Sequence, residues 1–309
     1  MPEIYDTIII GGGVTGFGAA MYAGRFEMKT LLLGDTMGGV IITTNEVANY
    51  PGFSLITGME LAEKLKQHAL EYKVKMLEKK VEEVRKAADG FVAVTVSEQF
   101  SGKTIIFATG TEWKKLKVPG EKEFANKGVH YCALCDGAFY KGKIVALVGG
   151  SDSAAKDALV LAEYAKKVYI VYRGEKIRPE PVNLRRVEAN QKIEVISKAN
   201  VLRIKGERFV KAITLDREFH GSQDLPVDGV FIAIGHLPLS SLAKRIGVTV
   251  NNKDEIIIDR HGFTNVEGVF AAGDVVDTEF KQAITGVAEG VTAAYNAYNY
   301  LQKAKVMPS

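Results

Sequence analysis

Cys132 and Cys135 make up a C-x-x-C motif, and they are the only two cysteines in the 309 residues. Two thiols at this spacing can close into a disulfide and open again without a large movement of the backbone. The thiolate is the reactive form of cysteine, and in a reducing compartment a lone C-x-x-C is more often redox-active than structural. The motif therefore predicts a dithiol that is alternately oxidised and reduced.

The carboxyl group of Asp136 follows the second cysteine directly. It could carry a proton to or from a departing thiolate, or it could cap the N-terminus of a helix. No metal is expected, because a structural zinc site needs four ligands: the two cysteines and His130 could supply three, and no fourth lies nearby. A thioredoxin domain is not expected either, since the motif does not stand at the start of a small α/β domain.

A glycine-rich turn near the N-terminus could bind the pyrophosphate of a dinucleotide. Gly11, Gly13 and Gly16 form G-x-G-x-x-G between a predicted strand over 4–10 and a predicted helix, which a strand over 29–33 follows. In such a unit the glycines permit the tight turn, the close approach of the backbone to the pyrophosphate, and the packing of helix on strand. The helix N-terminus then faces the phosphates with free N–H groups. The pattern predicts a bound dinucleotide.

The same pattern returns in altered form in the middle of the chain. Gly149, Ser151 and Ala154 form G-x-S-x-x-A after a predicted strand over 143–148, and a further strand is predicted over 167–172. Two such units in one chain suggest two dinucleotides. Ser151, however, places a side chain where a glycine would let the backbone approach a ligand. A second bound dinucleotide and a unit that keeps only the fold both remain open.

The elements around these motifs indicate the α/β class. Apolar residues at helical spacing predict an amphipathic helix over 58–72, and Asp89-Gly90 predicts the turn of a hairpin over 79–97. Further predicted elements are strands over 104–110, 194–196, 212–215, 228–235 and 269–274 and a helix over 282–301.

Length and composition exclude several classes of protein. The length suits about two domains, and 47% apolar with 25% charged residues is ordinary for a soluble globular protein. The formal net charge of +3 is too small to argue for nucleic acid. The uncharged stretch 7–24 follows Glu3 and Asp6 and is rich in glycine, which argues against a signal peptide or a membrane span. We therefore expect a soluble cytoplasmic protein with no nucleic-acid or membrane partner.

Together these motifs resemble the low-molecular-weight thioredoxin reductases, flavoproteins of the pyridine nucleotide–disulfide oxidoreductase group. The matching segments are IIIGGGVTG at 8–16, GGVIITTNEVANYPGF at 38–53, ATG at 108–110, CALCDG at 132–137, DGVFIAIGHLP at 228–238 and GVFAAGDV at 268–275. The resemblance implies two Rossmann-like dinucleotide-binding domains, the second inserted into the first. Residues 1–112 and 241–309 would form a discontinuous FAD-binding domain, and residues 113–240 an NAD(P)-binding-like domain that carries the C-x-x-C.

The resemblance also implies roles for single residues. Cys132 would attack the protein substrate, Cys135 would face the flavin, and Asp136 would be the acid/base. The FAD residues would be Gly11, Gly13 and Gly16 at the pyrophosphate, Gly39 and Gly110 within the matching segments, Asn49 near the flavin ring, Gly273 and Asp274 on the ribityl-phosphate side, and Gln282 and Ala283 with their backbone at the isoalloxazine. Asp35, about 20 residues after the glycine motif, could hold the adenosine ribose or simply belong to a turn.

A homodimer is typical of this family, as is a swing of one domain relative to the other. The hinges would fall near 111–117 and 238–243, and Trp113 would pack within the first linker.

The sequence departs from the family pattern at two places. Val40 stands where the family has a glutamine, which removes a hydrogen bond near FAD. Members that use NADPH carry H-R-R-x-x-x-R to hold the 2′-phosphate, whereas residues 172–178 read YRGEKIR. Arg173 and Arg178 remain and could still grip a phosphate, but Glu175 would repel a phosphate or accept from a 2′-hydroxyl. NADPH and NADH therefore rank equally as donors, and reduced ferredoxin stays an alternative.

The prediction is an FAD-dependent thioredoxin-disulfide reductase that passes electrons to a thioredoxin- or glutaredoxin-like protein. Two other functions remain open. A flavin-dependent dithiol oxidase would use the same C-x-x-C to make a disulfide in a small product and pass the electrons to oxygen. A non-catalytic nucleotide-binding or redox-sensing protein would keep the fold with a weakened nicotinamide site.

Overall fold

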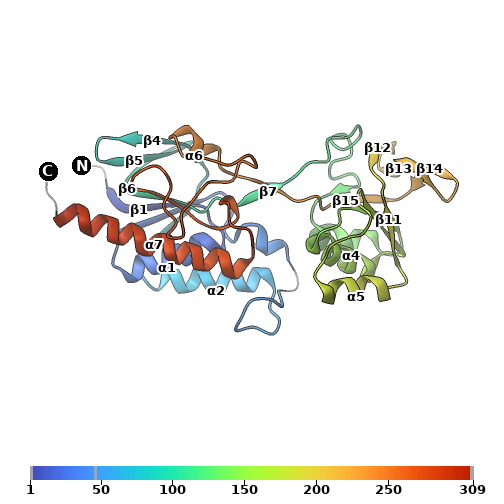
Figure 1. Cartoon of the computed structure of the whole chain (residues 1–309), viewed down its shortest axis with the longest axis horizontal. Coiled ribbons are helices and arrows are strands. Elements are labelled where there is room, and N and C mark those ends of the chain that lie inside the picture. The colour runs from blue at the N-terminus through green and yellow to red at the C-terminus, as the bar shows by residue number, and fades with distance from the viewer. Residues whose placement is uncertain (1–2, 45–46, 307–309) are drawn as a thin grey trace. The chain divides into compact units, whose positions relative to one another are not determined.

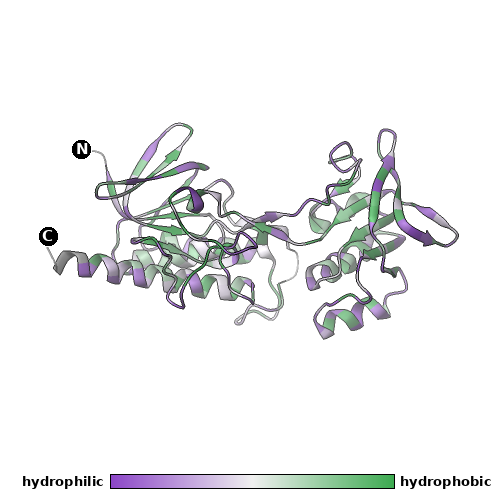
Figure 2. Ribbon diagram, turned by 45° about the horizontal axis from the view of Figure 1, so that its top comes forward, coloured by the Kyte–Doolittle hydropathy of each residue, from purple (hydrophilic) through white to green (hydrophobic). Residues whose placement is uncertain are grey.

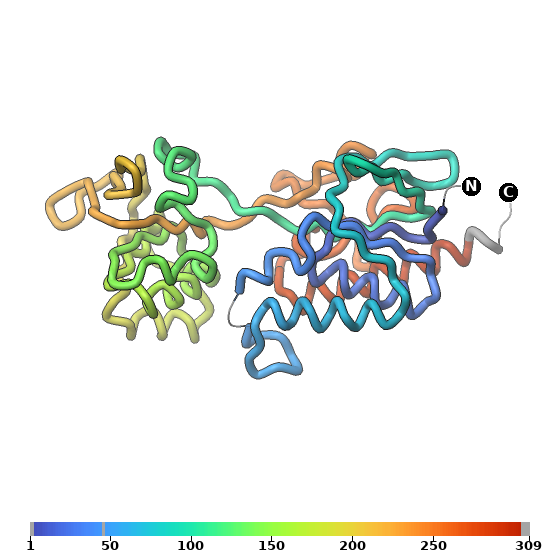
Figure 3. Tube along the Cα trace, turned by 180° about the vertical axis from the view of Figure 1, so that it is seen from behind, coloured from blue at the N-terminus to red at the C-terminus, as the bar shows by residue number. Residues whose placement is uncertain are grey.

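The computed structural model describes residues 3–44 and 47–306, and the chain divides into two compact units. Unit 1 comprises Met1–Glu112 and Leu237–Ser309, and unit 2 comprises Trp113–His236. The chain thus leaves unit 1 once and returns to it once, as the tube in Figure 3 shows. The two crossings fall at 112/113 and 236/237. The sequence analysis placed the domain boundaries at 112/113 and 240/241.

Unit 1 is built on a mixed sheet covered by helices (Figure 1). Within the described residues the strands run in the order β3 (Lys75–Glu78), β2 (Thr30–Gly34), β1 (Ile4–Ile10), β6 (Gln99–Phe107), β5 (Gly90–Thr95) and β4 (Val81–Ala87), and β17 (Val269–Ala271) also pairs with β6. The pairs among β3, β2, β1, β6 and β17 are parallel, whereas β5 and β4 continue the sheet antiparallel. The predicted α/β class is confirmed.

Apolar strands and small helix residues form the core of unit 1. Ile8, Ile9 and Ile10 in β1 are fully or almost fully buried, as a strand covered on both faces requires, and Figure 2 shows apolar residues along the central strands. Helix α1 (Val14–Arg25) packs against α7 (Ala283–Val306) and α2 (Gly58–Leu70). At this contact Gly18 lies against Val287, so that the two helices approach closely.

Local signals explain where several elements begin and turn. Thr57 and Glu60 form a capping box at the start of α2, each side chain accepting from the other's backbone N–H. Ala87 of β4 pairs with Gly90 of β5, so the hairpin turns at the predicted Asp89 position. The predicted helices over 58–72 and 282–301 are confirmed with slightly shifted ends.

Unit 2 contains a parallel sheet in the order β11 (Ile193–Ser197), β10 (Lys167–Tyr172), β9 (Ile144–Val148), β15 (Gly229–Ile232) and β8 (Val129–His130). The helices of this unit are α3 (Ala133–Asp136), α4 (Asp152–Tyr164) and α5 (Pro181–Ala189). A separate antiparallel sheet consists of β12 (Val201–Gly206), β13 (Val210–Phe219) and β14 (Ser222–Pro226). Helix α4 packs on α3, which contains Cys135 and has Cys132 as its N-cap. Gly137 just beyond α3 leaves room for Leu161.

The two crossing segments pair with each other through β7 (Thr111–Trp113) and β16 (His236–Pro238), and α6 (Ser241–Arg245) follows. Trp113 stacks on Tyr131 with ring centres 6.5 Å apart, which is the linker packing expected for it. The carboxylate of Glu121 accepts the backbone N–H groups of Leu116 and Lys117 and thereby fixes the loop that follows β7. No helix among the described residues is long and apolar enough to cross a membrane.

Candidate active site

Cys132 and Cys135 are joined by a disulfide, with their Cα atoms 5.4 Å apart. Cys132 ends the loop after β8 and is the N-cap of α3, where its sulfur accepts the backbone N–H of Cys135 at 3.0 Å. A helix N-terminus with an N–H donor at the sulfur stabilises a thiolate there. Cys132 is 9% exposed, whereas Cys135 is exposed. If Cys132 attacks a protein substrate, as predicted, this sulfur would have to become more accessible.

Asp136 is the last residue of α3. It is also the N-cap residue of the 3-10 helix Gly137–Tyr140, but its side chain makes no capping hydrogen bond there, whereas Cys132 is the N-cap of α3. The Oδ2 atom of Asp136 lies 3.1 Å from Nδ1 of His130, and Nε2 of His130 lies 2.8 Å from the Tyr140 hydroxyl. Burial lowers the pKa of His130 despite the neighbouring Asp136 carboxylate. The carboxyl group beside the cysteines is thus paired with a neutral imidazole.

In unit 1 the first glycine turn is an open cradle. A Cβ on Gly11 would meet the Ala108 carbonyl oxygen at 2.0 Å, and a Cβ on Gly16 would meet the Gly11 oxygen at 2.0 Å, so both positions require glycine. A Cβ on Gly13 would instead lie 3.8 Å from its nearest neighbour. No side chain caps α1, which begins after Gly13. A helix N-terminus without a side-chain cap fits the pyrophosphate of a dinucleotide.

Three further predicted FAD residues gather at or near this turn. Gly39 has φ +66° and lies directly over Gly13, and Gly38 donates its N–H to the Gly12 oxygen at 2.7 Å. Asp35 is exposed in the bend that follows β2, whose last residue touches Gly12. Gly110 has φ +64°, a conformation that favours glycine, and it follows β6. Residues 45 and 46 of the 38–53 motif lie outside the described residues.

Segments distant in the sequence meet at the second part of the predicted FAD site. Asn49 Nδ2 donates to Gln282 Oε1 at 2.9 Å across 233 positions of sequence, and Ala283 begins α7 directly after. Gly273, with φ +81°, packs against Thr15 of α1. The turn at Gly273 therefore lies next to the start of α1, which follows the first glycine turn.

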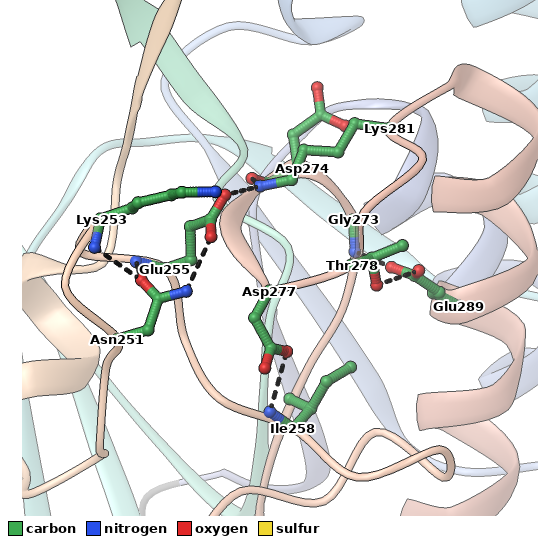
Figure 4. Close-up of polar contacts among 10 residues, drawn as sticks. All are labelled: Asn251, Lys253, Glu255, Ile258, Gly273, Asp274, Asp277, Thr278, Lys281 and Glu289. Carbon is green, nitrogen blue, oxygen red and sulfur yellow. Dashed lines mark hydrogen bonds and ion pairs between the residues drawn. The ribbon is translucent and has the colours of Figure 1, made fainter.

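The loop around Gly273 and Asp274 is held by acidic side chains that the sequence analysis missed (Figure 4). Glu289 of α7 accepts the Gly273 N–H at 2.7 Å and the Thr278 hydroxyl at 2.6 Å. Lys281 donates to the Asp274 carbonyl at 3.0 Å and also pairs with Glu255. A glutamate on the face of a long helix carries no sequence signal of such a contact.

The second glycine turn, in unit 2, is less open than the first. Gly149, with φ +154°, lies against the Ala233 oxygen and the methyl group of Ala154, so the turn has the tight form that the motif predicts. The Ser151 hydroxyl, however, accepts the Ala154 N–H at 3.4 Å and caps α4. The ring of Tyr172 lies flat over Gly150, within 2.4 Å of where a Cβ would stand.

The two retained arginines flank this turn. Arg178 donates its backbone N–H to the Gly150 oxygen at 2.7 Å, which places the 174–178 loop beside the turn. Arg173 and Arg178 have exposed side chains, and Glu175 pairs with Lys198 at 2.5 Å rather than with either arginine. The side chains of Arg173 and Arg178 could reach an anionic ligand, but the Ser151 hydroxyl already caps the N-terminus of α4.

The comparisons with known proteins agree with this geometry. Residues 5–290 match the family model described as pyridine nucleotide-disulphide oxidoreductase. The chain is 38% identical to the thioredoxin reductase of Bacillus subtilis, over 97% of this chain and 96% of that protein. The chain belongs to the thioredoxin reductase family of these oxidoreductases. The predicted family is thereby confirmed.

Two solved structures extend the comparison. The crystal structure of the thioredoxin reductase of Lactococcus lactis matches with a TM-score of 0.93 and 36% identity, covering 97% of this chain and 99% of that one. A ferredoxin-flavin thioredoxin reductase from Clostridium acetobutylicum matches with a TM-score of 0.53 and 31% identity, covering 98% of this chain and 100% of that one. The predicted fold of two Rossmann-like units, one inserted into the other, is confirmed.

Proposed function

We propose that this chain is an FAD-dependent disulfide reductase that passes electrons through the Cys132–Cys135 pair to a thioredoxin- or glutaredoxin-like protein. One observation carries the proposal: a single chain holds an uncapped glycine cradle in unit 1 and a closed C-x-x-C disulfide in unit 2. The relatives named thioredoxin reductase support it over nearly their whole length.

FAD would be bound by the segments 1–112 and 241–309. Gly11, Gly13 and Gly16 would hold the pyrophosphate with Gly39 above them, Asp35 would hold the ribose, and Gly110 would border the site. Asn49, Gly273, Asp274 and the backbone of Gln282 and Ala283 would hold the flavin end. When bound, FAD would supply the transfer of two electrons from the donor to the disulfide.

The cysteine pair would work in two steps. Two electrons break the S–S bond, and Asp136 gives a proton to the sulfur that is not kept as thiolate. Cys132, whose thiolate the N-cap position stabilises, attacks the disulfide of the partner protein. Cys135 then attacks Cys132, which closes the disulfide again and releases the partner in its dithiol form.

The electron donor would be a nicotinamide dinucleotide bound by residues 113–240, with NADPH and NADH ranked equally. Gly149, Ser151 and Ala154 would lie at its pyrophosphate, and Arg173 and Arg178 beside its ribose. A second candidate is a donor without nicotinamide, such as reduced ferredoxin. The capped N-terminus of α4 favours this second candidate, as does the likeness to the ferredoxin-flavin enzyme of Clostridium acetobutylicum.

An anaerobic titration of the purified, FAD-loaded protein tests these proposals. Bleaching of the flavin by NADPH or NADH names the donor, whereas bleaching by dithionite alone removes the nicotinamide proposal and leaves ferredoxin. We expect the reduced protein to reduce oxidised thioredoxin. The variants Cys132→Ser and Cys135→Ser should lose this activity. Rapid oxygen consumption with a small dithiol and no reaction with thioredoxin would instead indicate a dithiol oxidase. Intact NAD(P) binding without flavin reduction by any donor would indicate a sensor.

The protein would be a cytoplasmic homodimer. Sedimentation equilibrium of the FAD-loaded protein tests the assembly: twice the chain mass of 33.6 kDa is expected, and a monomer at micromolar concentration would contradict it.

A further inference from the structure

The ring of His130 packs against two aromatic rings and lies beside Asp136. His130 lies in β8, two residues before Cys132, and is 8% exposed. Its ring stacks on Phe231 with centres 5.2 Å apart and meets the ring of Tyr140 edge-on at 5.5 Å. Packing on two sides fixes the direction in which each ring nitrogen points.

Tyr140 determines which nitrogen carries the hydrogen. Its hydroxyl lies 2.8 Å from Nε2 of His130 and has no other hydrogen-bond partner among the described residues. Burial, with Asp136 and Asp228 nearby, raises the pKa of Tyr140 to about 12, so the hydroxyl keeps its proton. The hydroxyl therefore donates to Nε2, and in the neutral imidazole the hydrogen stands on Nδ1.

The Nδ1 hydrogen has one group to approach. Nδ1 lies 3.1 Å from Oδ2 of Asp136 but is not aligned with it as a hydrogen bond, and it has no other partner in the part of the chain that the structure describes. A buried donor without an acceptor costs about 1 to 3 kcal/mol. The Asp136 side chain, 30% exposed, can rotate to complete this bond.

We propose that His130 is a positioning residue for Asp136, holding Oδ2 through its Nδ1 hydrogen so that Oδ1 carries the proton exchanged with the cysteines. The inference rests on the proposed acid/base role of Asp136. In the closing step, Oδ1 takes the proton of the remaining thiol, the thiolate attacks the mixed disulfide, and the partner sulfur leaves with the bonding electron pair. In the opposite direction the same oxygen returns the proton.

Burial keeps the imidazole neutral during this exchange, against the effect of the nearby carboxylate. Burial lowers the pKa of His130, and Asp136 offsets this only in part. The Asp228 carboxylate accepts the Ile144 N–H at 2.9 Å, and the Lys143 ammonium lies 5.3 Å from the centre of the Tyr140 ring. An uncharged imidazole can donate its Nδ1 hydrogen to Oδ2 whether Asp136 is ionised or protonated. Oδ1 then stays available for the proton.

The test follows thiol–disulfide exchange and needs no electron donor. The full-length protein, reduced and freed of reductant, is mixed with the aromatic disulfide DTNB. The first thiolate release is bimolecular, and the second, first-order release reports closure of the cysteine pair. This second rate is measured between pH 6 and 9 for Asp136→Asn, His130→Phe, His130→Gln and His130→Asn. Phenylalanine keeps the stacking, glutamine keeps a partner for Tyr140, and asparagine keeps a donor near the Nδ1 position.

Asp136→Asn should slow the second release about 100-fold, as loss of general acid/base catalysis does. His130→Phe and His130→Gln should slow it about 10-fold, His130→Asn should stay within about 3-fold of the unaltered protein, and His130→Phe should add nothing in the Asp136→Asn background. If His130→Phe does not fold, the glutamine and asparagine variants carry the comparison.

Two results would overturn different parts of this proposal. An unchanged second release in Asp136→Asn overturns the acid/base role of Asp136 and with it the inference. A slow Asp136→Asn together with full rates for His130→Phe or His130→Gln, or with additive losses in the double variant, overturns the role of His130 alone.

Discussion

Replacement of Asp157 by asparagine should stabilise the protein, and more so at high pH. Asp157 lies on α4 and is partly buried. Burial raises its pKa from 3.8 to about 7, and no hydrogen bond or cation from the described residues offsets this. Because the folded-state pKa lies above the unfolded one, ionisation is harder in the folded protein. Stability is therefore lost as the pH rises from about 4 to about 7 and stays reduced above that.

The pKa shift sets the size of the effect. A shift of about 3 units at 1.36 kcal/mol per unit corresponds to about 4 kcal/mol at pH 8.5. At pH 5.5 the folded carboxyl group is still protonated while the unfolded one is ionised, so the cost is about 2 kcal/mol. Since the residue keeps some exposure, these values are upper limits. Asp157→Asn removes the cost, because an amide of the same shape does not ionise.

Chemical denaturation of the full-length apoprotein, followed by circular dichroism at pH 5.5 and 8.5, measures the effect. The gain from Asp157→Asn should be about 2 kcal/mol larger at pH 8.5 than at pH 5.5. Asp152→Asn on the same helix is the matched control. Burial alone would raise the pKa of Asp152, but hydrogen bonds from Lys156, Asn183 and the Glu180 N–H outweigh this and lower it. Its stabilisation is complete above the unfolded pKa, so Asp152→Asn should lose stability equally at both pH values. A gain from Asp157→Asn that does not change with pH would refute the reasoning.

Three further changes test the glycine turns and the linker. Gly13→Ala should leave the stability of the apoprotein within about 1 kcal/mol, because its Cβ would reach only ordinary contact with Gly39 at 3.8 Å, yet it should weaken FAD binding in a fluorescence titration. Unaltered FAD affinity would contradict a pyrophosphate site at this turn. Ser151→Gly removes the cap of α4 and should tighten NADPH binding in calorimetry by a few tenths of a kcal/mol, or about 2-fold, whereas Ser153→Ala on the same turn should not. Glu121→Ala leaves two backbone N–H groups and the Tyr131 hydroxyl without their acceptor, so it should cost at least about 2 kcal/mol of unfolding free energy, and a smaller loss would show that water replaces the carboxylate.

The elements with a strong local pattern were predictable from the sequence. The isoleucine run of β1 and the glycine turn after it could be read directly, because a buried parallel strand and a pyrophosphate turn both restrict residue type. The Asp89-Gly90 hairpin was similarly clear. By contrast, β3, β12, β14 and α5 were not predicted. Strand β14 is largely polar and exposed, and β12 does not alternate strictly between apolar and polar residues, so neither shows the pattern of a strand.

The candidate site was predictable where the chemistry demands a fixed residue type at a fixed spacing. C-x-x-C indicated the disulfide pair, and adjacency alone made Asp136 a candidate acid/base, which stays a prediction. Glu289 could not be found, because its contact with Gly273 depends on how α7 packs beside the late turn. The meeting of Asn49 with Gln282 likewise arises only when the first and last segments of the chain share one unit.

The two glycine turns show why a motif alone does not determine what is bound. Both form the same tight backbone, with Gly11 and Gly149 each pressed against the carbonyl of a neighbouring strand end. What differs is the position that faces the ligand: Gly13 leaves the N-terminus of α1 open, whereas the Ser151 hydroxyl satisfies a donor of α4 that a pyrophosphate would otherwise use. A phosphate at the second turn would have to displace that cap at a cost of about 1 kcal/mol. The backbone geometry therefore indicates the fold of both units, and we expect the side chain at this one position to affect how readily each unit would accept a dinucleotide.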